Sequence, residues 1–568
     1  MSNKTQKYKN STFFIVFIVL SIMMVLPFWL SHRIVIFSDF SFHASRVEEI
    51  ANNLSKGQFF TFIATKTFHH TGVASFLFYP TIFLYPWAIF SLFLNPINAF
   101  YLWYLIFTII TFYISYLCML AFSDNKMQSF IFSLLYTVVP YRLYLGTSVF
   151  GEFIAYSFLP IVFLGIYNIF WGKNDGLKWT ILSIGMALVG YSHILSVVLC
   201  CEFLLIITIF ALVTRRFNKA RIISLIKSVV LTFLLVIFEI IPFLQSFKKI
   251  YSPNQGIGIE TKFTQFIAYS LENLESNCSI GFILLLTLFV GIVFVDSKKY
   301  KFIYLLGVIA CFFATSLFPW KMFEHSPLAV IQLTFRYLAY ASLFLSVVSS
   351  KILLKVVKNR NTIGLIASLS LFVILFSAFA QQANLQLLRN FSSKDMIAKS
   401  TTTPVQSLPL QTVVNNFTYN KIFNYSVVFG EQDYYPIKAI ENPKNLNDKK
   451  ILSIMNNVTI INGQKKYYHP LFLPNRIVFK LKLKNNVQVD LPVLQYNGTF
   501  VKVNNKLVKY TQSSRGTVLI NLKKGNNIVE VGYRPWKLYY LTLFISAIAW
   551  IGLLYEYIKM HNKTLGNG

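Results

Sequence analysis

Five polar side chains near the amino terminus share the spacing of one helical face. They are Asp39, His43, Arg46, Glu49 and Asn53, and the 3.6-residue period of a helix places them on the same side. A carboxylate there can act as a base or a metal ligand, and an arginine can hold a phosphate through two parallel hydrogen bonds. We therefore expect a helix that directs acid–base and phosphate-binding groups into one space. The alternative is a surface helix with an ordinary solvated face.

A second carboxylate, Glu152, follows shortly after the sequence Pro140-Tyr141-Arg142. Both Glu152 and Arg142 are predicted at the external membrane surface, where an acidic side chain is costly and is rarely placed without a purpose. Glu152 is thus a second candidate catalytic group, in addition to Asp39, and Arg142 is a candidate substrate-binding group. The alternative is an interfacial ion pair between Glu152 and Arg142.

Two further candidates, His193 and Arg336, lie at predicted external ends of apolar segments. The alternatives are a hydrogen-bonded turn histidine and an arginine whose head reaches the interface along its apolar stem. The sequence contains no glycine-rich phosphate loop, no His-Glu-x-x-His, no Gly-x-Ser-x-Gly and no Cys-x-x-Cys,. This argues against an ATP-driven pump and a zinc hydrolase, and no protein metal site is predicted.

The composition indicates the kind of scaffold that positions these groups. Of the 568 residues, 55% are hydrophobic and 13% are charged, whereas soluble proteins carry about 25% charged residues. Apolar runs of about 20 residues, long enough to cross a bilayer as helices, recur along the chain. The formal charge of +31 is explained by basic cytoplasmic loops and anionic lipid. The sequence predicts a multi-pass membrane protein, and no module typical of nucleic-acid binding is present.

About twelve transmembrane helices are predicted from the apolar windows. The windows lie near residues 12–31, 98–122, 127–147, 150–171, 178–194, 195–213, 221–245, 279–296, 300–318, 329–352, 362–380 and 536–558. The segment 75–95 is also apolar, but its Tyr-Pro elements and its tryptophan favour the membrane interface over a crossing. Residues 32–97 then form one long external loop, and both termini lie in the cytoplasm.

Residues 381–535 differ from the rest of the chain because they are rich in Asn, Lys, Val and Tyr. Strand-like runs such as 477–483 are separated by turn signals such as Asn497-Gly498,. We expect an extracytoplasmic β-sandwich there. It follows a transmembrane domain of residues 1–380 and precedes a last transmembrane helix with a cytoplasmic tail, residues 536–568.

The order of these features resembles the GT-C membrane glycosyltransferases, a group that includes oligosaccharyltransferase catalytic subunits and protein O-mannosyltransferases. The segment Asp39-Phe-Ser-Phe-His43-Ala-Ser-Arg46 is similar to the opening of their first external loop. The stretch from Pro140-Tyr141-Arg142 to Glu152 is similar to their second external loop, which keeps another acidic residue. The resemblance implies a GT-C-like fold.

The chain also resembles bacterial membrane proteins labelled 6-pyruvoyl-tetrahydropterin synthase-related and the neighbouring YfhO-like family. The similar motifs are Asp-x-x-x-His-x-x-Arg, Pro-Tyr-Arg, Glu-x-x-Ala-x-x-Phe-Leu-Pro and a C-terminal pattern over residues 504–535. The histidine zinc site of a pterin synthase is absent, which argues against pterin chemistry. A Trp-Trp-Asp acceptor motif is also absent, which argues against protein N-glycosylation.

The GT-C resemblance implies a membrane glycosyltransferase that moves a sugar from a polyprenyl-phosphate donor to an envelope glycan or glycopolymer at the outer face. Asp39 is then the base that deprotonates the acceptor hydroxyl, and Glu152 orients the acceptor or a divalent cation. A cation is permitted by this chemistry but is not required. The groups that hold the donor phosphate or substrate are His43, Arg46, Arg142, His193 and Arg336.

Two other functions stay open at this point. A transporter or flippase for a lipid-linked glycan would use the same polar groups as a headgroup path, although the internal repeats and midplane polar groups typical of transporters are not evident. A non-catalytic envelope scaffold would need only the β-rich domain. Substitution of Asp39 or Glu152 would then leave the phenotype intact.

Overall fold

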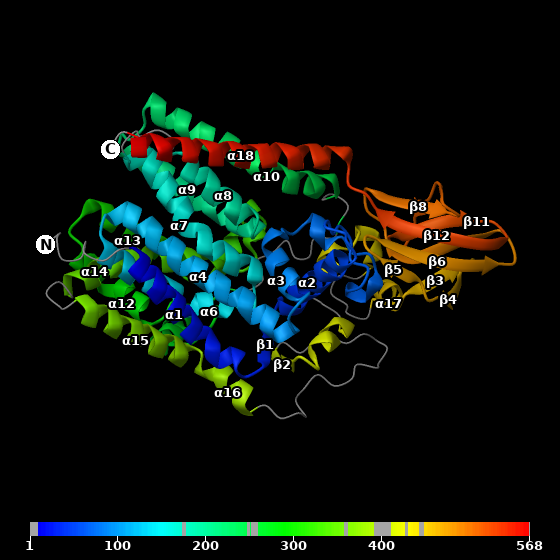
Figure 1. The fold of residues 1–568 in the computed structure, drawn as a ribbon, viewed down its shortest axis with the longest axis horizontal. Helices are drawn as coiled ribbons and strands as arrows, with labels where there is room; N and C mark the ends of the chain where they lie inside the picture. Colours follow the sequence, from blue (N-terminus) through cyan, green and yellow to red (C-terminus); the bar gives the residue numbers. More distant parts are fainter. Residues whose placement is uncertain are drawn as a thin grey trace. The chain divides into compact units, whose positions relative to one another are not determined.

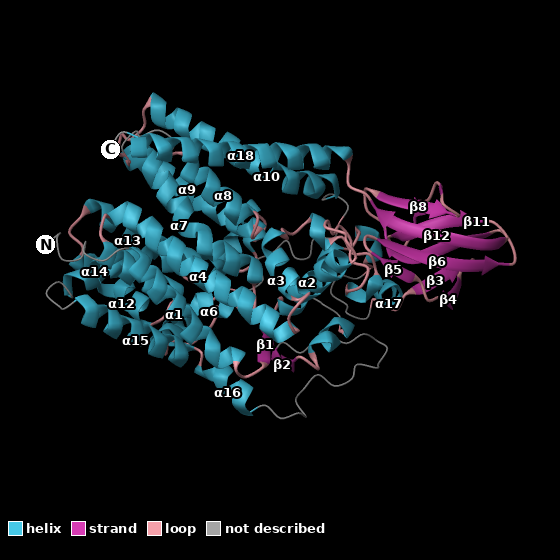
Figure 2. Ribbon diagram, viewed as in Figure 1, coloured by secondary structure: helices cyan, strands magenta, loops and turns pink. Residues whose placement is uncertain are grey.

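The computed structural model describes residues 10–172, 178–246, 250, 260–356, 362–390, 411–425, 430–441 and 448–566. Most of these residues are helical, and the strands are concentrated in the C-terminal region, as the magenta arrows of Figure 2 show. Figure 1 follows the chain from helix α1 in blue to helix α18 in red. The chain forms two compact units, each assembled from three stretches of sequence.

The first unit, which we call the helical unit, consists of Met1–Phe37, Pro96–Ser228 and Asn254–Ser393. It contains strand β1 (Arg33–Phe37) and helices α1 (Asn10–Trp29), α4 (Pro96–Ser123), α5 (Lys126–Thr137), α6 (Pro140–Leu145), α7 (Phe150–Trp171), α8 (Thr180–Gly190), α9 (Ile194–Val213), α11 (Phe263–Leu271), α12 (Phe282–Val290), α13 (Lys298–Ala314), α14 (Leu338–Val356), α15 (Thr362–Ala380) and α16 (Gln382–Asn390). Apolar side chains of α1, α4, α5 and α15 share one core. In this core Phe17 stacks on Phe112 with ring centroids 5.3 Å apart.

Eight helices in the described ranges are long and apolar enough to cross a membrane. They are Asn10–Trp29, Pro96–Ser123, Phe150–Trp171, Ile194–Val213, Lys219–Gln245, Thr334–Val356, Ile363–Ala380 and Lys537–Lys559. This number of apolar helices supports the predicted class, a multi-pass membrane protein. Several other predicted windows form shorter elements, such as the 11-residue α8 and the 9-residue α12. The count of twelve spans therefore stays a prediction.

The predicted span at 127–147 is not one continuous helix, because the helix breaks in its middle. Helix α5 ends at Thr137, and α6 begins at Pro140. Proline lacks the N–H of a helical hydrogen bond and disfavours the helical conformation in the residue before it. Val139 accordingly has φ −55° and ψ 130°.

Helices α7 and α8 pack closely because two glycines lie at their contact. A methyl group on Gly165 would lie 2.4 Å from the backbone of Leu182, and one on Gly185 would lie 2.7 Å from the backbone nitrogen of Val162. Small residues allow helix backbones to approach one another in this way. The contact holds α7, which carries Glu152 in its first turn.

The second unit, which we call the loop–β unit, consists of Ser38–Asn95, Val229–Pro253 and Lys394–Gly568. Its helices are α2 (Phe40–Ser55), α3 (Tyr85–Phe90), α17 (Lys449–Met455), α18 (Lys537–Gly566) and the larger part of α10 (Lys219–Ser246). Its strands are β2 (Gln411–Asn415), β3 (Val458–Ile461), β4 (Gln464–Tyr467), β5 (Leu471–Leu473), β6 (Arg476–Leu483), β7 (Val487–Leu494), β8 (Thr499–Val503), β9 (Lys506–Leu507), β10 (Thr511–Gln512), β11 (Thr517–Leu522) and β12 (Gly525–Tyr533). The segment 75–95 contains short 3-10 turns and α3.

Ten of these strands form two antiparallel five-stranded sheets. The strand orders are β10-β11-β7-β3-β4 and β5-β6-β12-β8-β9. Buried and more exposed residues alternate along much of β6, as expected for a strand with one face in a core,. Buried side chains of both sheets, among them Phe479 of β6 and Val489 of β7, belong to one hydrophobic core.

The long loop that begins at Ser38 is bound to these strands through Asn475. The side-chain oxygen of Asn475 accepts hydrogen bonds from the backbone N–H groups of Phe62 (2.7 Å) and Ile63 (3.3 Å). Its side-chain nitrogen donates to the carbonyl of Phe60 at 2.7 Å. One asparagine thus satisfies three backbone groups of a segment that is far away in the sequence.

Candidate functional site

A buried carboxylate and a buried guanidinium face each other in the helical unit. Glu152 lies in the first turn of α7, and Arg336 lies in the 3-10 turn Thr334–Tyr337 that leads into α14. The Nε atom of Arg336 is 4.0 Å from Oε2 of Glu152. Tyr141 of α6 donates a hydrogen bond of 2.5 Å to the other carboxylate oxygen, Oε1. Three separate segments therefore meet at one acidic group.

The facing atoms of this pair are not saturated. Within the described part of the chain, Glu152 Oε2 and Arg336 Nε have no hydrogen-bond partner. Their separation of 4.0 Å exceeds the length of a direct N–H···O hydrogen bond, about 2.7–3.2 Å. Because buried polar groups are nearly always paired, we infer that a polar atom of a bound molecule can interact with both side chains.

His193 is a neighbour of this pair. It is buried at the N-terminal end of α9, and its Nδ1 atom lies 2.9 Å from the hydroxyl of Ser196. Arg336 is close enough to act on His193 electrostatically. The imidazole therefore lies near the guanidinium of Arg336.

Arg142 is held by other partners through its two terminal nitrogens, whereas its Nε has no hydrogen-bond partner among the described residues. It is fully buried and donates hydrogen bonds to the carbonyl of Thr137 (3.2 Å) and the hydroxyl of Thr111 (3.1 Å). Its guanidinium carbon lies 4.8 Å from the ring centroid of Phe153. The ion-pair partner of Glu152 is Arg336, so the sequence alternative that paired Glu152 with Arg142 does not describe this structure.

In the loop–β unit, Asp39 occupies the residue before α2 and is half-buried. Its carboxylate accepts a hydrogen bond of 3.2 Å from the hydroxyl of Ser38. A second acid, Asp433, lies near it. Burial, and secondly the negative charge of Asp39, raise the pKa of Asp433 to about 7. The loop–β unit therefore holds two neighbouring carboxyl groups, one of which titrates near neutral pH,.

Arg46 lies in α2 and holds a distant part of the same loop. Its guanidinium donates to the carbonyls of Tyr79 (2.7 Å) and Pro80 (2.8 Å) and lies 3.5 Å from Nδ1 of His43. Burial lowers the pKa of Arg46 to about 10, so the group is charged at neutral pH. Two of its hydrogen bonds fix the Tyr79-Pro80 segment, which makes loop positioning one role of this residue.

The remaining polar residues of α2 are buried rather than solvated. Asn53 donates to the hydroxyl of Thr61 at 2.9 Å. Glu49 is completely buried, and its carboxylate accepts the backbone N–H groups of Thr65, Lys66 and Thr67 at 2.8–2.9 Å. The hydroxyls of both threonines donate to it at 3.1 Å. Glu49 is therefore a structural anchor of the loop.

The predicted site residues fall into two groups, one in each unit. The helical unit holds Arg142, Glu152, His193 and Arg336. The loop–β unit holds Asp39, His43 and Arg46. Over the ranges that the structure describes, no cluster of three or more His, Cys, Asp or Glu side chains has metal-binding geometry.

Three residues of these clusters were not predicted as site residues. Tyr141 belongs to the Pro-Tyr-Arg motif, and that motif could have identified it from the sequence. No sequence pattern marks Asp433 and Tyr434, because they come close to α2 only when the chain folds. The ring of Tyr434 stacks on that of Phe42, with centroids 5.8 Å apart.

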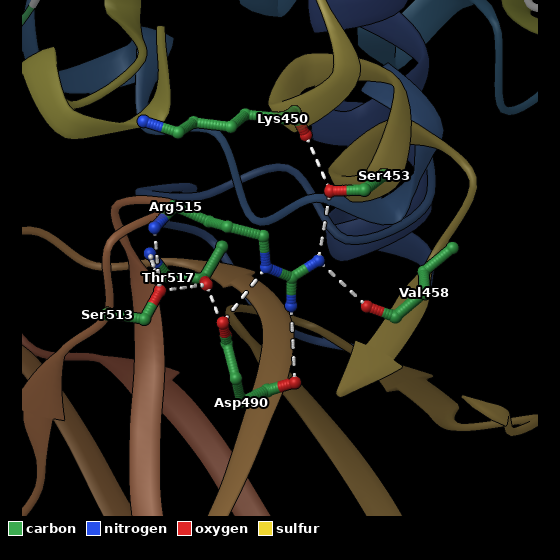
Figure 3. A network of polar contacts seen from close by, with 7 residues as sticks. All are labelled: Lys450, Ser453, Val458, Asp490, Ser513, Arg515 and Thr517. Atoms are coloured by element: carbon green, nitrogen blue, oxygen red, sulfur yellow. Dashed lines mark hydrogen bonds and ion pairs between the residues drawn. The ribbon is translucent and has the colours of Figure 1, made fainter. Parts of the chain in front are cut away.

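A buried pair between Arg515 and Asp490 in the strand region shows the contrasting, fully satisfied case (Figure 3). Arg515 Nε donates to Asp490 Oδ2 at 2.9 Å. Its Nη1 donates to the Ser453 hydroxyl and the Val458 carbonyl, and its Nη2 donates to the backbone carbonyl of Asp490. The hydroxyl of Thr517 donates to the second carboxylate oxygen at 2.5 Å. Both charges are saturated by the protein itself, so this pair has a structural role.

Comparisons with known proteins add little to this geometry. No protein-family model matches the chain, and no curated protein matches it. Among solved structures, the chain is similar to ArnT from Cupriavidus metallidurans, in a crystal structure with bound undecaprenyl phosphate. The TM-score is 0.30 and the identity 8%, over 73% of this chain and 87% of that one. The predicted YfhO-like naming stays a prediction from motifs.

Proposed function

We propose that the protein is an integral membrane glycosyltransferase that moves a sugar from a polyprenyl-phosphate donor to an envelope glycan. The observation that carries the proposal is the buried pair of Glu152 and Arg336, whose facing atoms are 4.0 Å apart and unsaturated. A carboxylate beside a guanidinium supplies the two groups that transfer from a phosphate leaving group needs. Eight apolar helices provide the membrane setting for a lipid-linked donor.

The chemistry assigns one task to each side chain. Glu152 accepts the proton of the acceptor hydroxyl while the hydroxyl oxygen forms a bond to the anomeric carbon of the sugar. The bond from that carbon to the phosphate oxygen breaks, and the polyprenyl phosphate leaves with the bonding electron pair. Arg336 binds the negative charge that grows on the phosphate. Tyr141 holds the carboxylate through its hydrogen bond to Oε1.

The geometry favours Glu152 over Asp39 as the base. Glu152 is almost fully buried, has an unsaturated oxygen and faces a cation. Asp39 is half-buried and neighbours a second acid, Asp433. In our proposal Asp39, His43 and Arg46 belong to the acceptor or donor path, and the strand-rich region binds the acceptor glycan. In the proposal His193 lies on the donor side near Arg336, Arg142 holds the Thr111 and Thr137 segments in place, and a divalent cation is optional.

The test compares envelope glycans by mass spectrometry in a strain that lacks the gene. The strain is complemented with wild type, Glu152→Gln or Glu202→Gln at equal membrane levels. Glu202 is the matched control, because it also lies in an apolar helix and accepts a tyrosine hydrogen bond, from Tyr337 at 2.7 Å. Loss of a general base costs about 10²–10⁴-fold in rate, so Glu152→Gln should lack one sugar increment that Glu202→Gln retains.

A further strain complemented with Asp39→Asn separates the alternatives. If the deletion alters the glycan and both Glu152→Gln and Asp39→Asn restore it fully, the protein is a transporter or a scaffold rather than a transferase. If only Asp39→Asn fails to restore it, the base is Asp39. If the deletion leaves every envelope glycan unchanged, the proposed acceptor is wrong.

A further inference from the structure

The helical unit contains a large cavity away from the candidate site. The cavity has a volume of about 450 Å³ and is lined by residues of α4, α5, α7, α9, α13 and α14. Its volume lies within the range of small-molecule sites, about 300–1,000 Å³. The lining from α7 begins at Pro160 and ends at Trp171, whereas Glu152 is in the first turn of that helix. At about 1.5 Å per residue, Pro160 lies roughly 12 Å along the helix from Glu152, and Trp171 roughly 28 Å.

The wall of the cavity is mainly apolar and aromatic. Phe163, Tyr167, Phe302 and Phe344 are among its lining residues. The rings of Phe210 and Phe302 stack with centroids 3.7 Å apart. Such a wall fits a hydrocarbon chain, because contact with apolar side chains removes the chain from water without leaving polar groups unpaired.

Three basic side chains, Arg216, Lys298 and Lys299, also line the cavity, and none of its described lining residues is acidic. The Nζ atom of Lys299 lies 3.1 Å from the carbonyl oxygen of Phe122 and 3.5 Å from the centroid of the Phe122 ring. Burial, and secondly the positive charge of Lys351, lower the pKa of Lys299 to about 8. An anion bound beside Lys299 would offset its repulsion with Lys351,.

The helices around the cavity also expose large apolar side chains. Leu205 and Leu212 of α9 are 61% and 59% exposed, and Leu305 of α13 is 49% exposed. In a protein with eight apolar helices, such surfaces face lipid. A ligand that reaches the cavity from the bilayer therefore needs no aqueous path.

We propose that this cavity binds an anionic membrane phospholipid, with one acyl chain against the aromatic wall and the phosphate headgroup on Arg216, Lys298 and Lys299. This site is additional to the proposed donor site, because neither Glu152, Arg336 nor Tyr141 lines the cavity, and its α7 residues begin about two helical turns after Glu152,. The inference does not depend on the glycosyltransferase proposal. Its test measures lipid binding, and that measurement does not require activity.

The test titrates the purified full-length protein with dioleoylphosphatidylglycerol or dioleoylphosphatidylcholine and counts bound lipids by native mass spectrometry. The variant Arg216→Gln/Lys299→Gln removes two lining cations. Its matched control, Arg215→Gln/Lys301→Gln, removes two exposed neighbours that do not line the cavity. We expect at least a tenfold loss of phosphatidylglycerol affinity in the first variant, unchanged affinity in the control, and weaker binding of phosphatidylcholine to the wild type.

A second arm tests the acyl chain. Ile303 lines the cavity, and Leu305, two residues later on α13, does not. Ile303→Trp should weaken phosphatidylglycerol binding, whereas Leu305→Trp should not. Size-exclusion chromatography shows whether either tryptophan variant is misfolded. If one is, the charge variants alone test the proposal. Equal binding of both lipids, equal loss in both charge variants, or inorganic phosphate binding as tightly as the lipid would each overturn the proposal.

Discussion

The buried carboxylate of Glu49 gives the sharpest prediction about the loop that carries Asp39. It accepts three backbone N–H groups and two hydroxyls from residues 65–67. In Glu49→Gln one oxygen becomes an NH₂ group, so at least one backbone N–H meets a donor instead of an acceptor. An unsatisfied buried donor costs about 1–3 kcal/mol, and hydrogen bonds to a charged group contribute about 1.5–3 kcal/mol. We expect the local opening free energy to fall by about 3 kcal/mol.

Amide hydrogen exchange measures this effect directly. A fall of about 3 kcal/mol corresponds to roughly 100-fold faster exchange of the amides of residues 65–67, at 1.4 kcal/mol per tenfold. The control is Glu48→Gln, because Glu48 pairs with Lys66 at 2.5 Å with both side chains partly exposed, and such pairs contribute about 0–1 kcal/mol. Equal exchange rates in Glu49→Gln and Glu48→Gln would refute the anchoring role of Glu49.

Two further predictions concern charges in the loop–β unit. Burial and Asp39 raise the pKa of Asp433 to about 7, so the folded state binds a proton that the unfolded state releases near pH 4. The stability that this group contributes is therefore fully present below about pH 4 and is lost as the pH rises to about 7. In Asp433→Asn the melting temperature should depend less on pH between about pH 4 and pH 7. A melting-temperature profile equal to that of the wild type would contradict this. Arg515→Leu leaves the buried Asp490 without its cation and should destabilise the strand region by about 3–5 kcal/mol, seen as faster exchange in β7 and β11. Its control, Arg476→Gln, breaks a partly exposed pair with N···O 3.8 Å, and an equal effect of both variants would argue against a special role for Arg515.

The helix at 39–53 was predictable because its polar residues follow a helical period, and α2 spans Phe40–Ser55. The burial of that polar face was not predictable. The groups that cover Glu49 and Arg46 come from residues 65–67 and 79–80, and helical periodicity carries no information about loops that fold back on a helix.

The pairing at Glu152 shows the same limit. Its residue type and its place near a membrane surface marked it as a candidate. Its ion-pair partner, Arg336, lies 184 positions later in the sequence and meets Glu152 only because α7 and the turn before α14 come together. The break between α5 and α6 was predictable in principle, because Pro140 is visible in the sequence. A hydropathy window does not detect it, since most residues on both sides of the proline are apolar,.

The binding of the long loop by Asn475 has a consequence for biosynthesis. Phe62 and Asn475 are separated by 413 residues. At about 5–20 residues per second, a ribosome needs roughly 20–80 s to make the intervening chain. During that time the loop that carries Asp39 has been synthesised, but its docking surface does not yet exist.

The hydrogen bonds of Glu49 differ because all of their partners lie within 18 residues. They can therefore form while the rest of the chain is still being made and inserted. Early closure of residues 65–67 around Glu49 would hold the loop in its folded conformation until Asn475 has been synthesised. Folding of this loop then has two steps: closure around Glu49, and later binding to Asn475, between β5 and β6.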